Sequence, residues 1–155
     1  MRGGWQADNF IVRDFRELKV WERSHRLTLA VYNATSAFPR EETYGLTAQL
    51  RRCTASMPAN IAEGCGRSGD AELGRFMLIS MGSASELDYH LLLARDLGYL
   101  SAQDYQELSQ GTQEVKRMLS TLITRLRHTK KPTRACLTAY EGSHIISEAM
   151  TTIAR

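Results

Sequence analysis

The sequence predicts an all-α protein that folds as an antiparallel up-down-up-down four-helix bundle. Apolar residues recur every three or four positions through most of the chain, which is the spacing of one helix face. No segment alternates as a strand does, and there is no Asn-Gly or Asp-Gly hairpin signal. The only prolines, at positions 39, 58 and 132, favour a few long helices with short connections, and short connections make neighbours antiparallel.

The first helix is expected from about Asp14 to Ala37, because Pro39 ends it. Its apolar stripe is expected to comprise Leu18, Trp21, His25, Leu29 and Tyr32, widened by Val20, Leu27, Val31, Ala34 and Phe38.

The second helix is expected from about Tyr44 to Glu63, with a stripe made of Leu46, Leu50, Cys53, Met57 and Ile61. Pro58 lies inside this helix and is expected to kink it. The proline leaves the carbonyl of Thr54 without its helical donor, and a nearby hydroxyl such as that of Ser56 is expected to compensate.

The third helix begins after Ser68 or Gly69 and stops at Gly98. Its buried side is expected to hold Leu73, Phe76, Ile79 or Ser80, Ser83, Leu87, Leu91 and Ala94. The fourth helix starts near Ser101, with Asp104 in the capping-box position. Its seam is Leu108, Val115, Met118 or Leu119, Leu122 and Leu126.

Length and composition indicate one intracellular domain. The chain has 155 residues, of which 43% are apolar and 24% charged, and no run is long enough to cross a bilayer. The N-terminus has no signal-peptide core, and three cysteines at unrelated spacings argue against a disulfide framework, so a cytoplasmic location is expected. We divide the chain into an arm (1–13), the bundle (14–131) and a C-terminal segment (132–155), which is either a tail or a short helix.

The charge of the chain is distributed unevenly, although the net charge is only +3. The segment 115–134 contains seven lysines and arginines and no acid, whereas the segment 67–110 contains seven acids and three arginines. This asymmetry favours either an anionic partner or self-association, while a solvated helix face is the simpler explanation.

No motif predicts catalysis, a cofactor or a metal. Residues 64–69 match the Gly-x-Gly-x-x-Gly pattern, but a helix precedes them where a nucleotide-binding fold has a strand. Glu22 and His25 form a Glu-x-x-His pair of the di-iron type, but arginines at 23 and 26 crowd it, and the second copy, at 141–144, lies outside the bundle. His25 is instead expected to be a core or interface residue. Cys53 is expected in the core, and Cys65, in the glycine turn, is expected to be more exposed and able to react.

Several motifs look familiar. They are Phe15-x-x-Leu18-x-Val20-Trp21, Glu42-x-Tyr44-Gly45-Leu46-x-x-Gln49, Ser56-Met57-Pro58-Ala59-Asn60-Ile61-Ala62-Glu63-Gly64-x-x-Arg67 and Gly82-Ser83-x-x-Glu86-Leu87. From about Phe15 to Leu126 the chain resembles the four-helix-bundle or intervening-sequence proteins, first noticed as reading frames inserted in bacterial large-subunit ribosomal RNA genes. The resemblance implies a barrel-like homopentamer without enzymatic activity. That family is also similar to the accessory protein of diversity-generating retroelements, a basic pentamer that binds nucleic acid and a reverse transcriptase.

The matched residues fall into two groups. Large apolar residues are expected in the core or at subunit contacts, namely Trp21, Phe38, Tyr44, Leu46, Ile61, Phe76 and Leu87, and Gly82 and Ser83 are expected to allow a close helix crossing. Four polar residues, Asn60, Glu63, Arg67 and Glu86, either satisfy helix ends and link helices or form a binding site, and the structural role is favoured.

Two functions follow as hypotheses. The first is an oligomer that binds RNA or DNA phosphates non-specifically, through the repeated cations Arg51, Arg52, Lys116, Arg117, Arg125, Arg127, Lys130 and Lys131. No aromatic residue interleaves with the basic run, so base stacking is not expected there. The alternative is a homo-oligomeric scaffold for a protein partner, in which the basic fourth helix of one subunit faces the acidic third helix of its neighbour.

Overall fold

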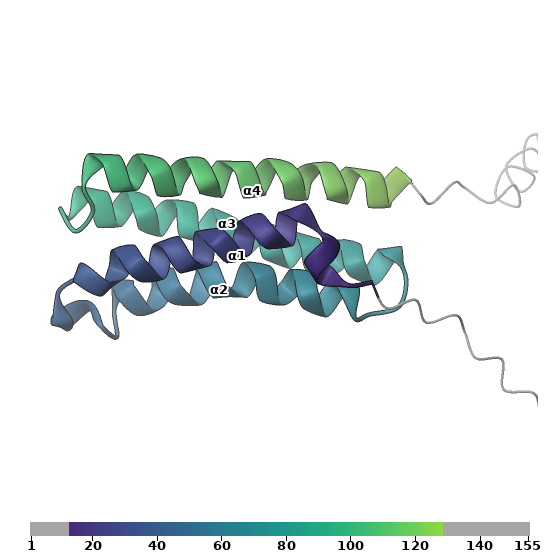
Figure 1. Ribbon diagram of the computed structural model, residues 1–155, viewed down its shortest axis with the longest axis horizontal. Coiled ribbons are helices and arrows are strands. Elements are labelled where there is room, and N and C mark those ends of the chain that lie inside the picture. The colour runs from purple at the N-terminus through teal and green to yellow at the C-terminus, as the bar shows by residue number, and fades with distance from the viewer. Residues whose placement is uncertain (1–12, 129–155) are drawn as a thin grey trace, which may run out of the picture.

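The structure is a computed structural model that describes residues 13–128, and these form a bundle of four α-helices (Figure 1). The α-helices are α1 (Lys19–Ala34), α2 (Leu46–Cys65), α3 (Asp70–Asp96) and α4 (Ala102–His128). Short 3-10 helices are η1 (Phe15–Glu17), η2 (Thr35–Ala37) and η3 (Arg40–Glu42). No strand occurs in this range, so the all-helical prediction is confirmed. The predicted C-terminal segment, and all of the N-terminal arm except Arg13, lie outside the described residues.

Each helix packs against two others, and the order around the bundle is α1, α2, α3, α4. Hence α2 lies diagonally across from α4, and α1 across from α3. Hydrogen bonds join Thr28 of α1 to Thr54 of α2, and Thr35 at the end of α1 to Arg51. The residue numbers rise on one helix as they fall on the other, so α1 and α2 run in opposite directions, as the colours of Figure 1 show for each successive pair.

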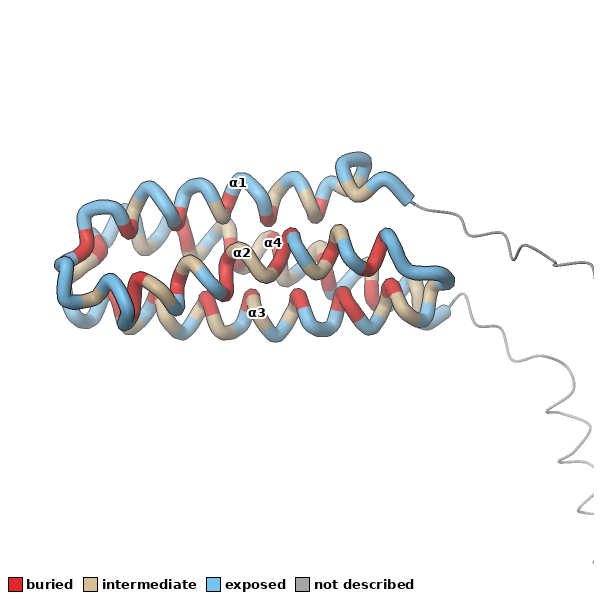
Figure 2. Tube along the Cα trace, turned by 90° about the horizontal axis from the view of Figure 1, so that it is seen from below, coloured by how far each residue is buried: buried red, intermediate tan, exposed pale blue. Residues whose placement is uncertain are grey.

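The core is formed by buried apolar side chains from all four helices. Figure 2 shows the buried residues on the sides of the helices that face the inside of the bundle. All five residues of the predicted α2 stripe are buried. On α3, Ser80 is buried and Ile79 is exposed, and Ala84 rather than Ser83 is fully buried. On α4 the core position is Leu119 rather than Met118. No helix among residues 13–128 is long and apolar enough to cross a bilayer.

The predicted face of α1 is right in its widening residues Val20, Leu27, Val31 and Phe38, which are buried, and wrong in its central stripe. The buried residues are Val20, Ser24, Leu27 and Val31, whereas His25, Leu29 and Tyr32 are exposed. Ser24 lies in the core because its hydroxyl donates to the carbonyl of Trp21 at 2.8 Å, which satisfies it without water. A serine at a core position therefore hid the centre of the buried face, and the exposed His25 and Tyr32 shifted the predicted centre around the helix.

Two further expectations concern an apolar and a small residue. Tyr44 was expected at the core or at a subunit contact; 94% of its surface is exposed in this single chain, so it lies outside the core, and the subunit contact stays a prediction. Gly82 was expected at a close helix crossing, but a Cβ atom there would meet nothing within 4 Å. The close approach lies at Gly64, where a Cβ would come 2.8 Å from the Cβ of Phe76.

Helix α2 continues through Pro58, and α1 supplies the compensating hydrogen bond. The hydroxyl of Thr28 lies 3.1 Å from the carbonyl oxygen of Thr54, which the proline leaves without its helical donor. The same hydroxyl lies 2.8 Å from the carbonyl of Ser24, so its proton is shared between two acceptors. The prediction that Ser56 would play this part is wrong, because Ser56 bonds Asn60 and Ser83 instead.

The ends of α3 and α4 follow the sequence signals. Gly98 has φ +76° and donates to the carbonyl of Arg95, while Tyr99 donates to that of Ala94, which is the hydrogen-bond pattern of a Schellman motif. The hydroxyl of Ser101 accepts from the backbone N–H of Asp104 at 3.0 Å and donates to its carboxylate at 2.6 Å, so the capping prediction for α4 is confirmed.

Candidate nucleic-acid interface

The C-terminal half of α4 is the most basic helical segment in the described part of the chain. It carries four of the predicted cations, and no acid occurs from Val115 to His128. These four are Lys116, Arg117, Arg125 and Arg127. Lys130 and Lys131 continue the run in sequence but lie outside the described residues.

The four cations differ in their surroundings. Lys116 is half-buried against α3, where its ammonium lies 3.1 Å from the carboxylate of Asp88, so much of its charge is neutralised within the chain. Arg117 and Arg127 are exposed, and their guanidinium groups make no hydrogen bond or ion pair with any residue from 13 to 128. Arg125 lines a groove between α1 and α4 together with Lys19. The outer side of α4 thus presents cations that face solvent.

Arg51 and Arg52 do not join this surface, because they lie on α2, diagonally across the bundle. The Nε of Arg51 donates to the hydroxyl of Thr35 at 2.9 Å, and its guanidinium lies over the ring of Tyr32, 5.0 Å from the centroid. Arg52 binds the carboxylate of Glu86 and the side chain of Gln49. The structure therefore brings the cations of α4 together and separates the pair on α2 from them.

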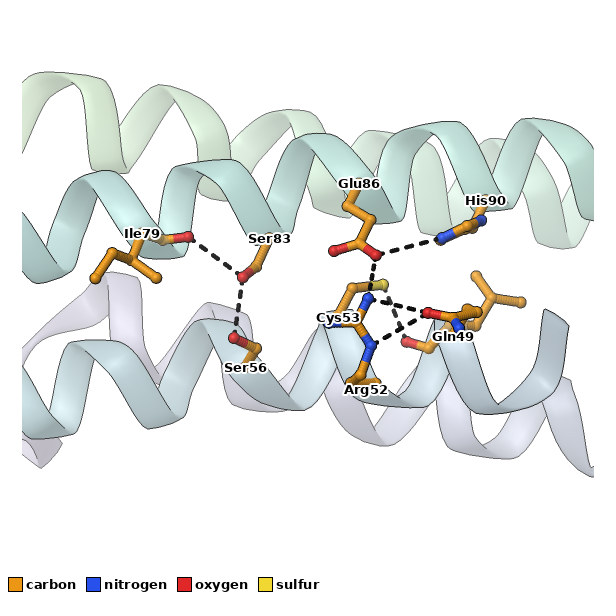
Figure 3. A network of polar contacts seen from close by, with 9 residues as sticks. Gln49, Arg52, Cys53, Ser56, Ile79, Ser83, Glu86 and His90 are labelled. Atoms are coloured by element: carbon orange, nitrogen blue, oxygen red, sulfur yellow. Dashed lines mark hydrogen bonds and ion pairs between the residues drawn. The ribbon is translucent and has the colours of Figure 1, made fainter. Parts of the chain in front are cut away.

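The four predicted polar residues do not form one cluster. Glu63 accepts from Arg67 at 2.6 Å on the exposed end of α2. Asn60 donates to the carbonyl and the hydroxyl of Ser56, one turn earlier. Glu86 alone links helices, as Figure 3 shows: it binds Arg52 of α2 and lies 3.6 Å from the Nε2 of His90. These contacts lie at three separate places: at the end of α2, within α2, and between α2 and α3.

Sequence reasoning missed two interhelical contacts of the same kind. Arg23 of α1 pairs with Glu114 of α4, with Nε 2.9 Å from Oε1. This hydrogen bond and charge hold the pKa of Glu114 below its ordinary value. The hydroxyl of Ser83 lies 3.0 Å from that of Ser56, which joins α3 to α2. Pairs so far apart in the sequence leave no local signal, and only the packing of helices brings them together.

Both described thiols are buried, so the expectation that Cys65 is exposed and reactive is wrong. Cys65 is the last residue of α2 rather than part of the turn, and 2% of its surface is exposed. Burial raises the pKa of its thiol. Cys53 is fully buried, and burial, with the charge of Glu86, raises its pKa to about 11. Neither thiol has the thiolate character of a nucleophile at neutral pH.

This predicts slow thiol labelling. In a Cys136→Ser variant, which removes the thiol outside the described residues, Ellman's reagent at pH 8 is expected to react much more slowly than with free cysteine, because both remaining thiols are buried and burial raises their pKa. After unfolding in urea, both thiols are expected to react at once. One rapidly labelled thiol in the native protein, mapped to Cys65 by mass spectrometry, would contradict this account.

The structure gives no support to the two motifs that sequence reasoning set aside. Gly64 and Cys65 of the glycine pattern still belong to α2, and a helix rather than a strand precedes the turn. The carboxylate of Glu22 accepts from Arg26 at 2.5 Å, and His25 stacks on Trp21. Among residues 13–128, no group of three or more His, Cys, Asp or Glu side chains is placed to hold a metal ion.

The fold and this surface define a helical-bundle protein with interhelical ion pairs and a cationic fourth helix. The chain belongs to the family of 23S rRNA-intervening sequence proteins, whose family model matches residues 16–121. It is similar to a crystal structure of a protein of unknown function from the S23 ribosomal protein family of Bacteroides thetaiotaomicron, with 21% identity and a TM-score of 0.63. That match covers 68% of this chain and 95% of the other, and it supports the fold. No curated protein matches this chain. Neither the family nor the similar structure is described as an enzyme.

Proposed function

We propose that this chain is a non-enzymatic, oligomeric helical bundle that binds nucleic-acid phosphates through the basic C-terminal half of α4. The observation that carries the proposal is that Arg117 and Arg127 are exposed and make no ion pair with any described residue, on a helix segment without acids. Such cations can exchange counterions for phosphates, which gives binding that falls as salt rises. Repetition by symmetry in an oligomer multiplies the effect.

The test is fluorescence anisotropy with labelled structured RNA and duplex DNA, at low and at physiological salt. Arg117→Glu and Arg127→Glu, singly and together, are expected to weaken binding to both ligands. The slope of log affinity against log salt is expected to fall by about 0.7 to 0.9 for each phosphate that the variant no longer neutralises. Lys130→Glu and Lys131→Glu extend the series along the same basic run.

The matched control is Arg40→Glu. Arg40 is exposed in the connection between α1 and α2, at the opposite end of the bundle from the C-terminus of α4 (Figure 1). The same change of charge there is expected to have little effect on binding. No binding at low salt, or equal loss in Arg40→Glu and Arg117→Glu, would remove the α4 proposal.

A homo-oligomeric scaffold for a protein partner is the second candidate, and the outer face of α3 favours it. This helix buries Leu73, Phe76, Leu87 and Leu91, yet its opposite side exposes Leu78 (48%), Ile79 (42%), Tyr89 (59%) and Leu92 (37%). A helix that is apolar on both sides is commonly covered on both sides.

Analytical ultracentrifugation tests this candidate and gives the number of subunits, for which the expectation is five chains of 17.5 kDa each. Ile79→Lys and Tyr89→Lys, both at exposed positions, are expected to dissociate the oligomer without unfolding the bundle. An oligomer held by apolar contacts resists salt, whereas one held by α3 and α4 charges dissociates as salt rises. A monomer at all concentrations would exclude both the oligomer held by apolar contacts and the oligomer held by charges.

A further inference from the structure

A row of aromatic rings lies along the outer side of η1 and α1, and its first two members, Phe15 and Trp21, are half-buried against the core. Phe15 packs on Trp21 with ring centroids 4.8 Å apart, and Trp21 stacks on His25 at 5.2 Å with planes only 5° apart. Tyr32 follows along the same face, 42% exposed. From Trp21 to Tyr32 the row runs for about 16 Å, since an α-helix rises about 1.5 Å per residue.

A guanidinium group lies over a ring at each end of this row. Arg16 lies over Phe15 at 4.4 Å from the centroid, and Arg51 of α2 lies over Tyr32 at 5.0 Å. Arg51 uses Nε to bond Thr35 and makes no ion pair with any residue of the described range. Arg16 is 69% exposed, and its contact with Asp14 is long, at 3.5 Å. Both groups therefore have N–H donors available for an anion.

Acidic residues also lie near the row. Glu22 is paired with Arg26, whereas Asp14, in its long contact with Arg16, and Glu17 remain as acids at the Phe15 end of the row. The outer face of α3 differs in chemistry, because its exposed residues are mostly aliphatic and acids accompany them along the helix. An aliphatic face suits another protein, whereas aromatic rings with flanking guanidinium groups suit flat, anionic ligands.

We propose that this row binds unpaired nucleobases, with a base stacked on the exposed ring of His25, a second on Tyr32, and phosphates at the two ends of the row held by Arg16 and Arg51. Single-stranded nucleic acids are bound in this way, by aromatic rings that stack bases and cations that follow the backbone. The proposal extends the proposed function from phosphate contacts on α4 to bases on α1. Arg51 lies too far from α4 to join the basic surface of that helix, and the proposal gives it a role in the α1 row.

The test uses a Trp5→Phe background, in which Trp21 is the remaining tryptophan, and three probes of known chemistry. These are a uridine decamer, an abasic decamer of equal charge, and a duplex. The decamer is expected to quench Trp21 fluorescence and to bind more tightly than the abasic strand. His25→Ala and Tyr32→Ala are each expected to weaken decamer binding by roughly 5- to 100-fold, because each removes one stacked base. Duplex binding is expected to stay within about twofold, since paired bases are not available for stacking.

Leu29→Ala is the matched control, because Leu29 lies on the same face, is 54% exposed and has no ring to stack. Equal binding of the uridine and abasic decamers, or unchanged decamer binding in His25→Ala, overturns the proposal. So does a loss of subunits in His25→Ala by ultracentrifugation, which would assign the row to a second copy. His25 is exposed and lies outside the core, so His25→Ala tests base stacking on the row even if Tyr32→Ala is unstable. The two proposals can fail separately. If Arg117→Glu loses duplex binding and keeps decamer binding, the proposal for the α1 row is supported. If the unaltered protein binds the decamer and does not bind the duplex, only the proposal for the α4 surface is contradicted.

Discussion

Gly64→Ala is expected to destabilise the bundle by about 1 to 3 kcal/mol, the usual cost of forcing an extra methyl group into a packed core. An alanine Cβ would come 2.8 Å from the Cβ of Phe76 and 3.2 Å from a methyl of Leu73. The Cβ of Phe76 is fixed to the backbone of α3, so relief requires α2 and α3 to move apart. The better helix propensity of alanine, about 1 kcal/mol, acts in the opposite direction and does not restore the packing. Urea unfolding followed by circular dichroism measures the change.

Gly82→Ala is the control for this prediction. Gly82 lies in the interior of α3 with open space around it, and its φ is not positive, so the same substitution is expected to stabilise the chain by up to about 1 kcal/mol. If Gly64→Ala lowers the free energy of unfolding and Gly82→Ala raises it, the effect at Gly64 comes from the close crossing of α2 and α3. Two stabilising substitutions would show that the helices separate at little cost and would contradict the packing described for Gly64.

Thr28→Val is expected to cost about 1 to 3 kcal/mol, because it leaves the buried carbonyl of Thr54 without a donor. Valine has the shape of threonine, so the loss is that of the hydroxyl. The decisive background is Pro58→Ala, which restores the backbone N–H that bonds the carbonyl of Thr54 within α2. There, Thr28→Val is expected to cost less than about 1 kcal/mol, the value of an ordinary hydrogen bond.

A double-mutant cycle from urea unfolding gives the coupling between positions 28 and 58. These side chains are linked through one carbonyl, so the two free-energy changes are expected to be non-additive by more than about 0.5 kcal/mol. Additive changes would mean that the carbonyl of Thr54 finds another partner, such as water, and that Thr28 acts only through the carbonyl of Ser24.

The candidate interface was predictable only in part. The sequence places Lys116, Arg117, Arg125 and Arg127 on one helix because they lie within one acid-free run. It does not reveal that Lys116 turns to Asp88 on α3, or that Arg51 and Arg52 lie across the bundle from the others. Such facts depend on which helices are neighbours, and contacts between residues dozens of positions apart have no local signal.

The sequence by itself determined the helices, their approximate ends and the buried face of α2, because periodic apolar residues, glycines and caps act within one or two turns. Only the tertiary structure decided where the centre of the buried face of α1 lies. There, Ser24 enters the core because its hydroxyl bonds its own helix, and His25, Leu29 and Tyr32 remain outside. Only the tertiary structure decided, too, that Gly64 rather than Gly82 permits the close crossing and that a hydroxyl from α1 satisfies the carbonyl opposite Pro58. In each case the physical reason is the same: burial and hydrogen-bond satisfaction depend on the neighbouring helix, and hydrophobic periodicity reports only on the helix itself.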